Sequence, residues 1–163
     1  MPIYMKFDNI KGDVTTEGFK DQIDLESMSF GVSRMVSMEP GNVKNREANS
    51  LPHVHTIALN KSLCSATPML LQKALAGAEA KTAIITFVRT GEAGTPPQVV
   101  GTYTLEGAII SDYQFIGSKG AHPQEGLQIS FTKVEVDFSG ADENNKNGQS
   151  VKVGYDLKVG KTL

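Results

Sequence analysis

Tryptophan is absent from the chain, tyrosine occurs four times and cysteine only once, as Cys64. A lone cysteine excludes an intrachain disulfide and is typical of a protein that folds in a reducing compartment. The shortage of aromatic residues disfavours a carbohydrate-binding module, because such a module prefers several exposed aromatic side chains.

An excess of one charge is also missing, since 16 basic residues face 18 acidic ones and the formal net charge is −2. A nucleic-acid-binding protein usually carries a basic patch, so this balance argues against nucleic acid as a partner. No apolar run approaches the roughly 20 residues of a membrane-spanning helix. The first residues alternate and lack the apolar run of a signal peptide. We therefore expect a soluble protein, made in the cytoplasm, with no membrane insertion.

The length of 163 residues predicts a single domain spanning residues 1–163. At this size folding buries roughly 70% of the unfolded surface, which is enough for a core without disulfides or metals.

The clearest strand signal lies between Leu127 and Phe138. Leu127, Ile129 and Phe131 share one face, as period-two alternation requires of a half-buried strand. After Phe131 the phase slips by one residue, and Val134 opens a second apolar set that continues through positions 136 and 138. A bend near residues 132–133 keeps both sets on one core. A similar slip near Glu26 predicts a second bend.

Several other segments alternate in the same way and predict further strands. A mid-strand glycine, Gly107, indicates a corner. These strand-like segments are residues 3–7, 22–34, 53–59, 83–90, 99–116 and 151–159. Bent strands of this kind indicate a mainly β protein, specifically a small antiparallel β-barrel of two crossed sheets.

One helix is expected, at about residues 67–77. Thr67 is predicted to be its N-cap, Pro68 its first helical residue and Gly77 its C-terminal closing residue. The apolar stripe expected to face the sheet contains Leu71, Ala74, Leu75 and Ala78.

The segment Pro40–Pro52 has little periodicity. So long a loop in a compact domain is usually functional or disordered, and a projecting functional arm is the favoured interpretation. Within it we take Val43, Lys44, Arg46 and Glu47 as interface candidates.

Candidate chemistry is sparse. His53 and His55 share a strand face, but zinc needs at least a third ligand, and the remaining histidine, His122, lies in a turn-rich segment. Cys64 is interpreted as packing, because no orienting histidine lies nearby in sequence. The polar segment 139–148 resembles a calcium loop only loosely. We expect no catalytic, cofactor or metal site.

Taken in order, several segments resemble the Hcp family, the haemolysin-coregulated tube proteins of bacterial type VI secretion. No one of these segments is diagnostic, but the ordered set covers nearly the whole chain. They are residues 3–7 followed by Ile10-Lys11-Gly12, residues 23–25 and 29–33, Ser65–Leu70, Phe131–Phe138 and Val153–Leu157.

The resemblance implies a non-enzymatic structural subunit. Its partners are further copies in hexameric rings that stack into a tube, the sheath and tip-spike proteins, and small effector proteins in the lumen. It also implies secretion by the type VI apparatus without a signal peptide, and contacts between the Pro40–Pro52 arm and neighbouring subunits. Two alternatives stay open: a monomeric ligand- or carbohydrate-binding β-barrel, and a small hydrolase built around Cys64 or the histidines.

Overall fold

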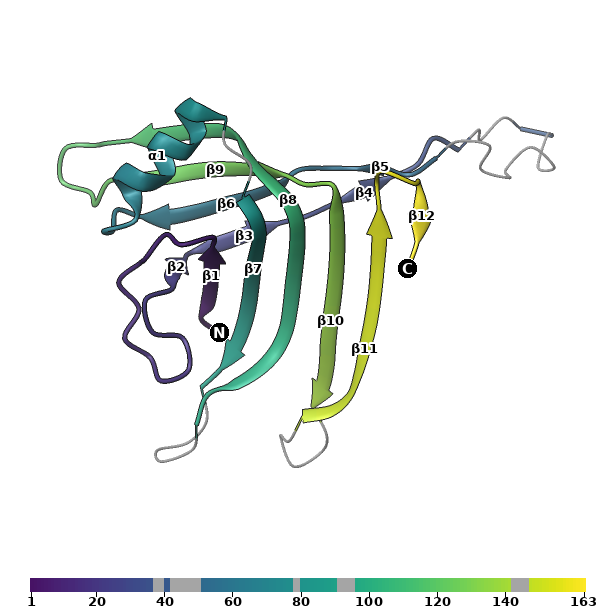
Figure 1. The fold of residues 1–163 in the computed structure, drawn as a ribbon, viewed down its shortest axis with the longest axis horizontal. Helices are drawn as coiled ribbons and strands as arrows, with labels where there is room; N and C mark the ends of the chain where they lie inside the picture. Colours follow the sequence, from purple (N-terminus) through teal and green to yellow (C-terminus); the bar gives the residue numbers. More distant parts are fainter. Residues whose placement is uncertain (37–39, 42–50, 78–79, 91–95, 142–146) are drawn as a thin grey trace.

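The computed structural model describes residues 1–163 except 37–39, 42–50, 78–79, 91–95 and 142–146. The fold is mainly β, with 56% of residues in strands and one short helix in the described ranges (Figure 1). The elements are β1 (Ile3–Phe7), β2 (Ile23–Leu25), β3 (Ser27–Ser29), β4 (Val32–Ser33), β5 (His53–Val54), β6 (Ile57–Ser62), α1 (Thr67–Ala76), β7 (Ala80–Arg89), β8 (Gln98–Ile116), β9 (Gln124–Ser130), β10 (Lys133–Ala141), β11 (Asn147–Asp156) and β12 (Lys161–Thr162).

The strands form two antiparallel layers that share β8. The first layer has the order β12-β11-β10-β8-β7-β1-β2, and the second contains β3, β6, β9 and the far half of β8. A separate two-stranded ribbon, β4–β5, leaves the body. The prediction of crossed sheets with a flanking helix is confirmed. The two layers are not closed into a barrel, so the fold is two crossed sheets that share β8.

The predicted corners are present. Gly107 adopts a positive φ of 61°. β8 pairs with β10 as far as Glu106 and with β7 as far as Ala108, and it pairs with β9 from Ile109 onward. Glu26 separates β2 from β3, and residues 131–132 separate β9 from β10. Each corner turns the chain from one layer into the other, so side chains from both layers enter the same core.

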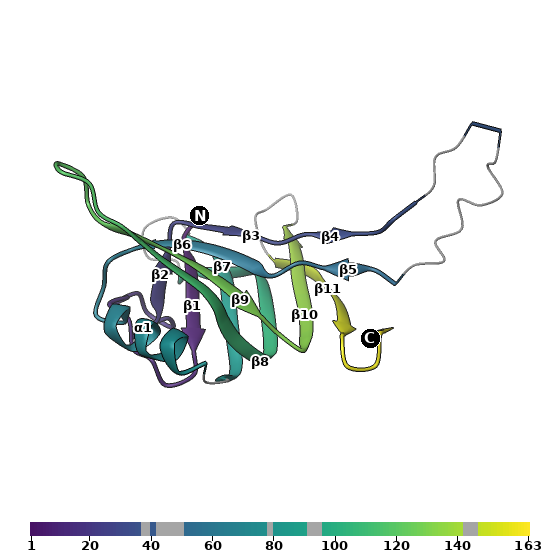
Figure 2. The same cartoon turned by 90° about the horizontal axis from the view of Figure 1, so that it is seen from above.

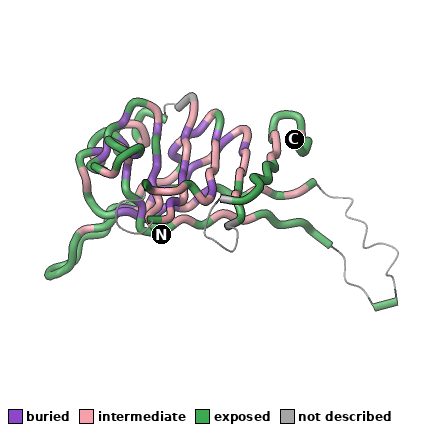
Figure 3. The backbone as a smooth tube through the Cα atoms, turned by 90° about the horizontal axis from the view of Figure 1, so that it is seen from below, coloured by how far each residue is buried: buried purple, intermediate pink, exposed green. Residues whose placement is uncertain are grey.

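The core lies where the two layers face each other, and exposed residues dominate the projections (Figure 3). Leu127, Ile129, Phe131 and Val134 are all buried in this cluster. Position 136 packs against it, whereas Phe138 stays 41% exposed. The prediction that both apolar sets share one core is therefore confirmed for every member except Phe138.

Helix α1 covers the core with a face different from the one predicted. Its fully buried residue is Leu70. Of the predicted stripe, Ala74 packs against the core, but Leu71 and Leu75 are 39% and 80% exposed, so the prediction is wrong for both leucines. Ala78, the last member of that stripe, lies outside the described residues. Burial of a leucine side chain contributes about 1.5–3 kcal/mol, so Leu70 supplies much of the attachment of the helix.

The two ends of the helix also differ in how well they were predicted. Gly77 closes it in the left-handed conformation, with φ 59°, as expected. Thr67 is not the N-cap: Ala66 holds that position, without a side-chain cap hydrogen bond. The Thr67 hydroxyl is engaged elsewhere, since it donates to Glu125 at 2.8 Å and accepts from the Cys64 N–H at 3.2 Å.

Thr67 belongs to a buried polar cluster that joins four elements. Lys61 on β6 lies directly opposite Glu125 on β9, and both side chains are fully buried. The Lys61 ammonium and the Thr67 hydroxyl donate to one carboxylate oxygen of Glu125, and the Tyr113 hydroxyl of β8 donates to the other. The cluster therefore fixes the helix and the β8–β9 hairpin to β6.

The protonation of this cluster follows from its contacts. Burial raises the pKa of Glu125, but hydrogen bonds from Lys61, Tyr113 and Thr67 together lower it by more. The net pKa is therefore below its usual range. Burial and the hydrogen bond to Glu125 raise the pKa of the Tyr113 hydroxyl. Glu125 is therefore charged and Tyr113 neutral at physiological pH.

We expect Lys61→Met to destabilise the subunit by about 3–5 kcal/mol, because it leaves the Glu125 carboxylate buried without a cation. The double variant Lys61→Met/Glu125→Leu should recover much of this loss, since it removes both charges. Urea unfolding measures both changes. Lys133→Met is the control, because its partners Glu106 and Glu135 form a pair network at the surface, and it should cost less. A Lys61→Met variant as stable as the control would contradict the assignment.

We expect the stabilisation by Glu125 to be lost in acid. A carboxyl with a lowered folded-state pKa contributes fully above its unfolded pKa, about 4.3, and loses that contribution as the pH falls through the folded pKa. The difference in unfolding free energy between the wild type and Glu125→Gln should therefore shrink below about pH 4. Chemical denaturation across this range measures it, and a difference that stays constant with pH would contradict the prediction.

Candidate assembly surfaces

The projecting arm predicted from the sequence leaves the body as a paired ribbon (Figure 2). Val32 pairs with Val54 and Ser33 with His53. The His55 ring bonds the Ser33 hydroxyl at 3.0 Å, and the His55 N–H donates to the Gly31 carbonyl at 3.0 Å. These contacts set the direction in which both strands leave the body.

The interface candidates Val43, Lys44, Arg46 and Glu47 all lie in the range 42–50, outside the described residues. Their role as contact residues stays a prediction. The structure describes the base of the arm, and the base carries a surface that the sequence did not indicate.

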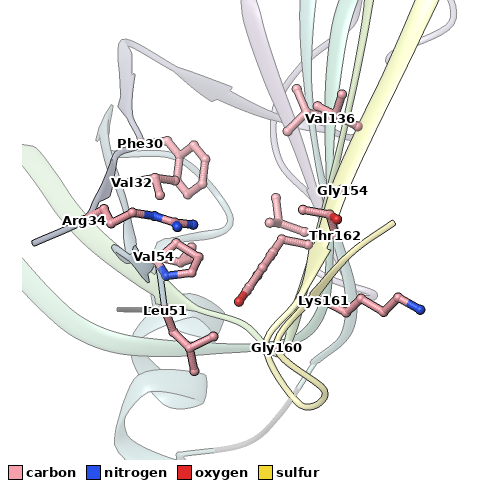
Figure 4. A pocket seen from close by; sticks show the side chains of 14 residues that line it. Phe30, Val32, Arg34, Leu51, Val54, Val136, Gly154, Gly160, Lys161 and Thr162 are labelled. Atoms are coloured by element: carbon pink, nitrogen blue, oxygen red, sulfur yellow. The ribbon is translucent and has the colours of Figure 1, made fainter. Parts of the chain in front are cut away.

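That surface is an apolar groove between the arm base and strands β10–β12, with a volume of about 620 Å³. In Figure 4, Phe30, Val32 and Val54 lie on the arm side, with Gly154 and Thr162 across from them. Phe30 also packs near Phe131, with ring centroids 6.2 Å apart, and so connects the groove to the core.

Several apolar groups around the groove are open to water. Val32 is 58% exposed, Leu51 76% and Val153 57%. Alternation had suggested one strand running to residue 159, but β11 ends at Asp156. Contiguous exposed apolar surface of this kind marks an interaction site.

A second projection lies at the opposite end of the molecule, where β8 and β9 extend as a hairpin (Figure 2). Phe115 and Ile116 near its tip are more than half exposed. Leu75 on helix α1 is a third exposed apolar group. The exposed apolar side chains are thus distributed over several faces and do not converge on one pocket.

Among the described residues, the candidate chemical groups do not combine into a reactive site, and residues 142–146 of the segment compared with a calcium loop lie outside that part of the chain. The rings of His53 and His55 pack edge to face, 4.9 Å apart. Within the described residues there is no group of three His, Cys, Asp or Glu side chains placed to hold a metal ion. Cys64 is half-buried and packs against the core.

In the described part of the chain, no helix has the length and apolar character needed to cross a membrane.

Known structures match the whole fold. One described as the structure of a type six secretion system protein aligns with a TM-score of 0.90 and 21% identity, covering 99% of each chain. Hcp1 from Salmonella typhimurium aligns with a TM-score of 0.79 and 21% identity, over 99% of this chain and 98% of its own. A type VI secretion system effector from Yersinia pestis aligns with a TM-score of 0.73 and 20% identity, over 94% of this chain and 98% of its own.

A search of curated proteins gave no match. A family model described as "Type VI secretion system effector, Hcp" matches residues 4–138. This range extends from the first strand through Phe138, so it includes the second layer, all three corners, the helix and the first layer up to β10, while β11 and β12 lie beyond it. The chain therefore belongs to the Hcp family of type VI secretion proteins.

Proposed function

We propose that the protein is a structural subunit of the type VI secretion tube, forming hexameric rings that stack and are ejected. Membership of the Hcp family supports this role. The observation on this chain that carries it furthest is the apolar groove of about 620 Å³ at the arm base. A groove with exposed valine and leucine side chains is best explained by a protein partner that covers it.

The shape of the subunit suits assembly into rings. A ring needs heterologous contacts, in which one surface of a subunit meets a different surface of its neighbour. The arm and the β8–β9 hairpin project at opposite ends (Figure 2), so the subunit has two distinct ends to offer. Sheath and tip-spike proteins are further proposed partners.

Export and cargo complete the proposal. The protein is made in the cytoplasm and leaves the cell as part of the ejected tube. Small effector proteins bind in the ring lumen and are carried with it. A lumen lined by polar strand faces holds them with modest affinity, which permits release.

The alternative function is that of a monomeric ligand-binding module. The groove volume favours this alternative, because small-molecule sites span roughly 300–1,000 Å³. The two functions differ in particle size, because a ligand-binding module needs no second copy.

We expect native mass spectrometry at micromolar concentration to show a particle of six chains. The reason is that the exposed apolar surfaces lose their contact with water when subunits associate. Light scattering on the same sample provides the second measurement. A monomer at every concentration tested would exclude the tube function and leave the ligand-binding module.

We expect the arm to matter more for assembly than for folding. Replacing Val43–Ser50 by a short Gly/Ser linker leaves the described core intact, so the circular dichroism spectrum should stay unchanged while ring association or stacking weakens. Sedimentation velocity measures the assembly. A linker of the same length in place of residues 118–121 on the β8–β9 hairpin is a matched control for loop replacement. Rings and tubes that form as in the wild type would show that the arm is an ordinary loop.

A further inference from the structure

The first layer ends in two edges of opposite charge. In Figure 1 it runs from β2 on one side of the molecule to β12 on the other, with five strands between them. The chain near β2 is acidic, and residues 156–163 around β12 hold two lysines and one aspartate. The net charge of −2 conceals this separation.

The acidic edge surrounds a cavity of about 380 Å³ whose lining includes Asp13, Asp24 and Glu26 and contains no lysine or arginine. Residues 13–26 hold five acidic residues and one basic residue. The three carboxylates make no ion pair within the described residues. Asp13 accepts the Ser65 N–H at 3.0 Å, and Glu26 accepts from the side chains of Ser62 and Gln124. Each of these donors is neutral.

One of these carboxylates, Asp24, lies in an unfavourable electrostatic field, whereas hydrogen bonds from Ser65 lower the pKa of Asp13. Burial and the neighbouring charge of Glu26 raise the pKa of Asp24. Asp24 and Glu26 therefore hold like charges close together, with no ion-pair partner among the described residues. An external cation placed here would relieve the repulsion.

The backbone at this edge is already paired. The Gly12 N–H donates to the Asp21 carbonyl at 2.9 Å, and the Val14 N–H donates to the Gln22 carbonyl at 3.2 Å. Residues 12–14 thus cover the outer side of the chain that leads into β2. This edge presents carboxylates and not a row of unpaired backbone groups. A partner is therefore recognised by charge and not by the addition of a strand.

The opposite edge carries a turn between β11 and β12 from which two lysine side chains project. The Asp156 carboxylate accepts the backbone N–H groups of Lys158 at 2.8 Å and Val159 at 3.4 Å, so it is used within the turn. Gly160 takes a positive φ of 64°, which permits the tight return into β12. Lys158 and Lys161 are exposed, and neither makes an ion pair within the described part of the chain.

We propose that the lysine turn of one subunit, carrying Lys158 and Lys161, docks at the Asp13–Asp24–Glu26 cavity of a second copy of this chain. This inference rests on the proposed tube function and names the contact that joins neighbours within a ring. The two surfaces lie at opposite edges of one sheet, so each subunit can offer its lysine turn to one neighbour and its acidic cavity to another. Such a heterologous contact propagates from copy to copy until the ring closes.

Reversing one edge at a time tests the pairing. Asp24→Lys/Glu26→Lys leaves Asp13 as the one carboxylate in the cavity against two lysines, so both docking surfaces are then basic. Lys158→Glu/Lys161→Glu makes both docking surfaces acidic. Each double variant alone should lose association by about tenfold or more, because like charges then face each other. The quadruple variant, with both edges reversed, should assemble again. Lys119→Glu, a reversal on the exposed β8–β9 hairpin, is the control and should assemble normally.

Mixing the two double variants gives the most specific result. Each contact in the mixture joins a basic edge to an acidic one only if the two variants alternate around the ring. Native mass spectrometry should therefore show mixed particles with equal numbers of each variant. Raising the salt concentration should weaken wild-type association by screening the contact.

The outcomes separate this inference from the function on which it rests. Wild-type rings together with double variants that assemble normally overturn the pairing and leave the tube function standing. Double variants that fail alone and are rescued neither by mixing nor by the quadruple change also overturn it. If Asp24→Lys/Glu26→Lys does not fold, Asp24→Asn/Glu26→Gln replaces it, and its association should lose the salt dependence of the wild type. A wild type that stays monomeric at low salt removes both proposals.

Discussion

The fold depends on one strand serving two sheets. β8 runs from Gln98 to Ile116, pairs with β7 and β10 in one layer, and then pairs with β9 in the other. The chain turns a corner where β8 changes partner. Gly107 lies at this corner with a φ of 61°, a conformation that a residue with a side chain adopts only with strain. β7 and β10 pair with the first half of this strand and β9 with the second, and the core forms between the two layers that these halves begin.

The corners were predictable because they leave a mark in the pattern. A slip in alternation, as between Phe131 and Val134, has no explanation in a straight strand. The helix face was not predictable, because Leu70 and Leu71 are both apolar and adjacent. Only the sheet decides which of them is buried. The exposure of the β11 valines was not predictable for a related reason: alternation identifies an apolar face but not whether anything covers it.

The buried ion pair could have been found from the same alternation. Ile57 and Leu59 point inward, so Lys61 continues their phase, and Glu125 continues the phase of Leu127 in the opposite direction. The sequence predicted neither, because a charged residue usually indicates a solvent-facing position. The charged edges were missed because they are separated by over a hundred residues in sequence. They become comparable only when the sheet order is known.

The cluster at Glu125 also restricts how this sequence can change over generations. Its hydrogen-bonded partners stand on β6, β8 and α1, and side chains that share one network do not contribute independently. A substitution acceptable beside an apolar residue at position 125 is harmful beside a carboxylate, and the reverse also holds. We therefore expect substitutions at positions 61, 67, 113 and 125 to be tolerated only in combination. A relative with an apolar residue at one of them is expected to carry compensating changes at the others.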